Sequence, residues 1–81
     1  MKLDGKMDLE DYIEEESEGK PNRLMTEAEV LERLQISPRH LCRLRHGRNR
    51  RGIKLNCIDI GHQTRRYRLR DVLTVEWEFM K

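Results

Sequence analysis

The sequence predicts a small, mainly α-helical domain with one β-hairpin, its elements arranged in the order α-α-β-β-α. Three observations support this fold class. Two helix-start signals follow one another closely, the apolar spacing then changes from a helical period to alternation, and a last helical period closes the chain. A length of 81 residues leaves room for one domain with one small core.

Residues 1–22 are acidic and poor in apolar side chains, so we expect a flexible leader before a folded domain of residues 23–81. Residues 1–20 contain eight Asp and Glu against three Lys, a net charge of −5. An alternative interpretation stays open. Leu9, Tyr12 and Ile13 follow a helical spacing, which would instead place a short amphipathic helix on a suitable surface.

The first helix of the domain is predicted over residues 27–34. Thr26 and Glu29 form a T-x-x-E capping box, in which each side chain satisfies a backbone amide at the helix start. An apolar face follows, made of Ala28, Val30, Leu31 and Leu34.

A second helix is predicted over residues 38–46. Ser37 is a good N-cap, Pro38 suits the first helical position, and Gly47 suits the left-handed position after the helix end. Two helices joined by a three-residue turn are typical of a helix-turn-helix.

A basic hairpin is predicted after a loop at residues 48–52. Ile58 and Ile60 alternate with polar residues, residues 61–64 have turn chemistry, and a second strand carries arginines. One face of this hairpin is predicted to be apolar and the other cationic. A cationic hairpin behind a helix-turn-helix is typical of a wing, so the predicted fold is a winged helix-turn-helix.

The last helix is predicted from Asp71 to about Met80. Its apolar residues form two rows that span an arc of roughly 200°, which is wider than one side of a core needs. We therefore expect part of this helix, around Trp77 and Phe79, to face a partner.

Charge is concentrated in the second half of the chain. Residues 39–70 contain eleven Lys and Arg against Asp59 alone, a net charge of +10. Such a field attracts polyphosphate, and nucleic acid is the expected partner. A signal peptide and a membrane-spanning stretch are both absent from the sequence, so we expect a cytoplasmic, nucleoid-associated protein.

Exposed positions of the second helix form the predicted base-reading surface. Arg39, His40 and Arg43 lie opposite Leu41 and Leu44, and arginine can donate two hydrogen bonds to guanine in the major groove. The hairpin and the preceding loop would contact the phosphate backbone or minor groove. The full predicted DNA-binding set is Ser37, Arg39, His40, Arg43, Arg48, Arg50, Arg51, His62, Gln63, Thr64, Arg65, Arg66 and Arg68.

The blocks TEAEVLERLQISPRHLCRLR and IDIGHQTRRYRLRDVLTVEW resemble the MerR-like winged helix-turn-helix of small phage excisionases and AlpA-type regulators. This resemblance implies recognition by the second helix and the wing. It also implies a role in site-specific recombination or in regulating genes of mobile elements. Two features depart from the family pattern: the longer, more basic stretch of residues 48–55, and the acidic leader.

The sequence also contains residues that bear on other functions. Cys42, His46, Cys57 and His62 could form a zinc site, but a C-x-x-C knuckle is absent, so we expect no metal, no cofactor and free thiols. Catalysis is not expected because the basic region offers too few carboxylates. A protein-interaction module stays open, in which Trp77 and Phe79 contact an integrase or other copies of the chain. The acidic leader could also lie over the basic surface and mimic phosphate.

Overall fold

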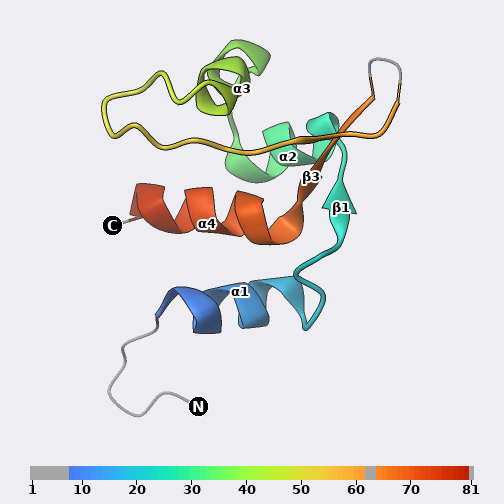
Figure 1. Cartoon of the computed structure of the whole chain (residues 1–81). Helices are drawn as coiled ribbons and strands as arrows, with labels where there is room; N and C mark the ends of the chain where they lie inside the picture. Colours follow the sequence, from blue (N-terminus) through green and yellow to red (C-terminus); the bar gives the residue numbers. More distant parts are fainter. Residues whose placement is uncertain (1–7, 62–63, 81) are drawn as a thin grey trace.

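A computed structural model describes residues 8–61 and 64–80 of the chain. Within these residues it contains four helices and one three-stranded antiparallel sheet, an α+β arrangement that is mostly helical. The chain order is α1 (Leu9–Ser17), β1 (Leu24–Met25), α2 (Glu27–Leu34), α3 (Pro38–Arg45), β2 (Ile58–Asp59), β3 (Arg65–Arg68) and α4 (Leu69–Met80). Helix α4 lies between α1 on one side and the α2–α3 pair on the other (Figure 1).

The predicted caps of α2 and α3 are confirmed. The Thr26 hydroxyl accepts a hydrogen bond from the Glu29 amide at 3.2 Å, and the Glu29 carboxylate accepts one from the Thr26 amide at 2.8 Å. The hydrogen bond from the Thr26 amide lowers the pKa of Glu29. The Ser37 hydroxyl accepts the His40 amide at 3.2 Å. Gly47 follows the end of α3 with φ +69°, a conformation that glycine adopts without strain. Local sequence therefore determines both helices.

The predicted hairpin is confirmed as an antiparallel pair of β2 and β3, with Ile58 opposite Arg66. Its predicted apolar face is wrong at Ile60, which is 52% exposed, while Tyr67, which alternates with Arg66 and Arg68, is fully buried. The sequence also did not predict β1, which pairs with the other edge of β3 and places Met25 opposite Tyr67. The core side of the sheet therefore comes from β1 and β3.

Helix α4 begins at Leu69, two residues before the predicted start. The amides of Leu69 and Arg70 donate at 2.8 Å to the carbonyls of Arg23 and Pro21, respectively. Two carbonyls of the segment before β1 thus accept the hydrogen bonds of two amides at the start of α4. A capping side chain would otherwise have to accept these hydrogen bonds. This pairing also fixes the chain that connects α1 to the rest of the domain.

The prediction of a flexible leader is wrong for the described residues from Asp8 onward. They form α1, which begins with Asp8 as N-cap and packs against α4. Ile13 is only 1% exposed and belongs to the core. The alternative interpretation, a short amphipathic helix that includes Leu9, Tyr12 and Ile13, is therefore confirmed. This helix covers part of the wide apolar arc of α4 and lies on the side of α4 away from α3 (Figure 1). Its acidic residues Glu10 and Glu16 pair with Arg70 and Arg33.

One apolar core connects these layers. The side chains with less than 2% exposure come from every part of the described chain: Ile13, Val30, Leu41, Leu44, Leu55, Tyr67, Val72 and Leu73. Leu41 and Leu44 anchor α3, so its opposite face is left to solvent. No helix among the described residues is long and apolar enough to cross a membrane.

Candidate nucleic-acid interface

Helix α3 presents two arginines on the face opposite the core. Arg39 and Arg43 are exposed, one helical turn apart, while Leu41 and Leu44 are fully buried. The predicted outward placement of both arginines is thus confirmed. Ser37 is exposed as well, although its hydroxyl is used to cap α3.

His40 is held in place by the end of α4. It is half-buried, and its ring meets Phe79 edge to face, with centroids 6.3 Å apart. His40 therefore lies at the border between the exposed face of α3 and the apolar end of α4. The sequence did not indicate this contact, because the two residues lie in different helices.

The stretch after α3 is an ordered loop, residues 46–55, here called the Asn49 loop. The Asn49 side-chain oxygen accepts the amides of Arg51 and Ile53 at 3.1 and 3.0 Å, and its amide donates to the Ile53 carbonyl at 2.7 Å. The Gly52 amide donates to the Asn49 carbonyl at 3.1 Å. Asn at the first and Gly at the fourth position of a turn form a recognisable signal, which our sequence interpretation missed.

The three predicted arginines of this loop are not equivalent. Arg51 donates a hydrogen bond to the carbonyl of Glu78 and so ties the loop to the last turn of α4. Arg48 and Arg50 are exposed, and neither forms an ion pair with any described residue. Arg51 thus has a structural role that the prediction did not give it.

The hairpin carries the other predicted residues. Arg65 is exposed and lies 3.9 Å from the Asp59 carboxylate, while the half-buried Arg66 donates to the Arg65 carbonyl at 2.9 Å. Arg68 is exposed on β3, and Thr64 is half-buried, with its amide donating to the Gly61 carbonyl. His62 and Gln63 lie outside the described residues.

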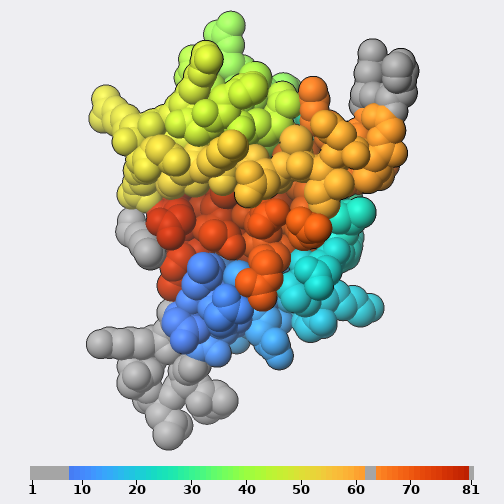
Figure 2. Space-filling view, viewed as in Figure 1, coloured from blue at the N-terminus to red at the C-terminus, as the bar shows by residue number. Residues whose placement is uncertain are grey.

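Arginine pairing divides the molecule into two sides. On the side of α1, Arg23, Arg33 and Arg70 all pair with glutamates, and hydrogen bonds to Glu10 raise the pKa of Arg70. Figure 2 shows α3, the Asn49 loop and the hairpin on the side of α4 away from α1. There, five exposed arginines form no ion pair with a described residue: Arg39, Arg43, Arg48, Arg50 and Arg68.

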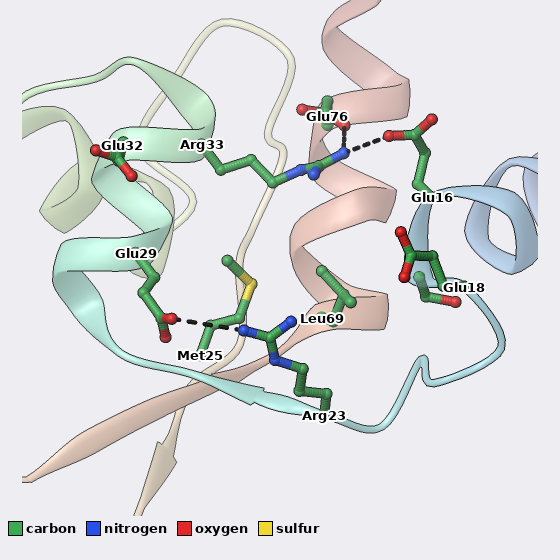
Figure 3. Close-up of a pocket in the computed structure, with 10 residues that line it drawn as sticks. Glu16, Glu18, Arg23, Met25, Glu29, Glu32, Arg33, Leu69 and Glu76 are labelled. Carbon is green, nitrogen blue, oxygen red and sulfur yellow. Dashed lines mark hydrogen bonds and ion pairs between the residues drawn. The ribbon is translucent and has the colours of Figure 1, made fainter.

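A hollow of about 560 Å³ lies between α1, β1, α2 and α4, and Figure 3 shows its charged lining. Arg33 extends into it and lies 2.8 Å from the Glu16 carboxylate and 2.9 Å from that of Glu76 (Figure 3). Burial acts to lower the pKa of Arg33, but these hydrogen bonds raise it overall. Two carboxylates already neutralise Arg33, so the hollow does not offer an anion site. The ion pairs of Arg33 instead connect α2 to α1 and α4.

The described residues contain no group of three or more His, Cys, Asp and Glu that could hold a metal ion. Cys42 and Cys57 are half-buried free thiols. His62, the fourth member of the zinc alternative, lies outside the described residues.

The basic side carries the donor groups that pair with phosphate and with base edges. Exposed guanidinium groups donate paired hydrogen bonds to phosphate oxygens or to the O6 and N7 atoms of guanine. Helix α3 places two of them on one convex face, with further arginines on the Asn49 loop and the hairpin. No family model, curated protein or solved structure matches this chain.

Proposed function

We propose that this chain binds double-stranded DNA, with α2 and α3 as a helix-turn-helix and the β2–β3 hairpin as its wing. The observation that carries the proposal is the exposed pair Arg39 and Arg43 on α3, neither of which has an acidic partner among the described residues. Exposed arginines without acidic partners favour binding to a polyanion.

In this proposal α3 enters the major groove. An α-helix fits that groove, and Arg39, His40 and Arg43 would then contact base edges. Arg65, Arg66 and Arg68 of the hairpin would grip the phosphate backbone or minor groove, which sets orientation more than sequence. The resemblance to small phage excisionases and AlpA-type regulators extends the proposal to recombination directionality or to transcriptional regulation in a mobile element.

Fluorescence titration of a labelled duplex at several salt concentrations tests the proposal. Binding should weaken steeply with salt, because each neutralised phosphate contributes about −0.9 to the slope of log K against log salt. The double variant Arg39→Gln/Arg43→Gln should lose at least about tenfold in affinity.

A matched control removes the same charge from the other side of the molecule. Arg23 and Arg70 are 60% and 43% exposed and pair with glutamates. The double variant Arg23→Gln/Arg70→Gln should change affinity by less than about twofold. Equal losses in both double variants, or no binding by the unmodified chain, would contradict the proposed interface.

A second candidate function is a protein contact at the end of α4. Phe79 and Met80 are 42% and 57% exposed and border a mostly apolar hollow of about 260 Å³ with Leu34 and Ile36. Another copy of the chain or an integrase would cover these side chains. Light scattering of the chain and of Phe79→Ala tests this candidate, which predicts concentration-dependent assembly that the substitution abolishes.

A further inference from the structure

The Asn49 loop is joined to α3 at both of its ends. The Arg48 amide donates to the Arg43 carbonyl, and the Leu55 amide donates to the Leu44 carbonyl, each at 2.9 Å. Leu55 is itself 1% exposed in the core. The loop therefore leaves the end of α3 and returns to it, so its position relative to α3 is fixed by backbone hydrogen bonds and by one buried anchor.

The loop is cationic and has no internal compensation. Residues 46–55 contain three arginines and one lysine but no aspartate or glutamate. Arg48, Arg50 and Lys54 are exposed, and Asn49 holds the backbone between them through three side-chain hydrogen bonds. Positive charges held on one short loop repel each other, which costs free energy unless counterions or a polyanion surround them.

The loop and the hairpin project in opposite directions. In Figure 1 the Asn49 loop extends to one side of α3 and the hairpin to the other, with α3 between them. The major groove is about 12 Å wide and has one phosphate backbone along each edge. A helix lying in the groove therefore leaves one backbone on each side, within reach of whatever projects from that side of the protein.

We propose that the Asn49 loop is a second backbone clamp, which grips phosphates on the side of α3 opposite to the hairpin. This inference rests on the proposed DNA binding and deepens it by assigning one backbone to each projection. Arg48 and Arg50 contact the phosphates. Asn49 and Arg51 are positioning residues, because Asn49 shapes the turn and Arg51 ties it to the carbonyl of Glu78.

Salt-dependent titration of a random-sequence duplex is the first test. The double variant Arg48→Gln/Arg50→Gln should reduce the magnitude of the salt slope by about 2 and lower affinity at least about tenfold at 0.1 M salt. Lys20→Gln is the control, since Lys20 is exposed beyond the end of α1 and its loss should leave the slope unchanged. Circular dichroism melting verifies that each variant folds.

Hydroxyl-radical footprinting is the second test, on a duplex selected by the unmodified chain from a random pool. Arg48→Gln/Arg50→Gln should expose the backbone on one flank of the footprint, and Arg65→Gln/Arg66→Gln should expose the other. Asn49→Ala keeps every charge and should still weaken protection on the loop's flank alone. A general loss of stability would weaken both flanks.

The outcomes separate the two proposals. A steep slope in the unmodified chain that Arg48→Gln/Arg50→Gln leaves unchanged would overturn the clamp and leave the proposed function standing. Loss on the same flank in both double variants would also overturn it. Absence of duplex binding by the unmodified chain would overturn the proposed function and, with it, the clamp.

Discussion

The ring of Tyr12 on α1 lies against the indole of Trp77 on α4, with centroids 5.2 Å apart and planes inclined by 47°. The Tyr12 hydroxyl donates to the Glu76 carboxylate, which also accepts from Arg33. An aromatic contact and an ionic network thus join α1 to α4 and α2. The acidic segment of the described chain is consequently part of the folded domain.

Trp77→Ala should lower the free energy of unfolding by about 2–3 kcal/mol, because it removes the aromatic contact and leaves a gap between α1 and α4. Urea unfolding followed by circular dichroism measures this loss. Phe79→Ala, at a side chain that is 42% exposed, should cost less than about 1 kcal/mol. Unchanged stability with lost self-association in Trp77→Ala would instead identify Trp77 as a contact to a partner.

Alkaline pH should loosen the same contact. Burial, together with the Glu76 carboxylate, raises the pKa of Tyr12 from 10.0 to about 12. A group whose pKa is higher in the folded state contributes stability that is complete below the unfolded pKa and is lost as pH rises through the folded pKa. Unfolding free energy should therefore fall by about 1–2 kcal/mol between pH 10 and pH 12, after allowance for partial exposure.

Comparison with Tyr12→Phe isolates this ionisation. The variant cannot ionise at residue 12, so its unfolding free energy should fall less over the same pH range. All other titrating groups, Tyr67 included, are common to both proteins. Parallel pH profiles for the two proteins would contradict the assignment.

The sequence predicted those elements whose specification is local. Thr26 with Glu29, and Ser37 with Pro38, specify their helix starts within four residues, and both caps form as predicted. The outward placement of Arg39 and Arg43 follows directly from the burial of Leu41 and Leu44 on the opposite face.

The features that the sequence did not predict depend on distant contacts. Tyr12 and Trp77 are separated by 65 positions, and the spacing of either helix alone does not show that the two faces meet. β1 has only two residues, too few for an alternating pattern, and it forms because β3 offers an unpaired edge. Ile60 shows the converse, since its apolar character predicted burial but it is 52% exposed among the described residues.

Tyr67→Phe should stabilise the protein by about 1 kcal/mol. Tyr67 is fully buried, yet its hydroxyl has no hydrogen-bond partner among the described residues. Burial raises the pKa of Tyr67, and Arg45 acts in the opposite direction. Removing an unsatisfied buried hydroxyl while keeping the ring relieves its desolvation cost. Thermal melting of both proteins measures the difference, and a lower melting temperature for Tyr67→Phe would show that a bound water satisfies the hydroxyl.

Base discrimination should separate α3 from the hairpin. In the proposed complex Arg39 and Arg43 contact base edges, so Arg39→Ala or Arg43→Ala should reduce the affinity ratio between a selected duplex and a random one by about fivefold to 150-fold. Arg66 lies on the hairpin, and Arg66→Ala should weaken both duplexes alike and lower the salt slope by about 1. Competition titrations with the two duplexes measure the ratio. Equal losses for all three variants on both duplexes would leave only a generic polycation, with no reading of bases by α3.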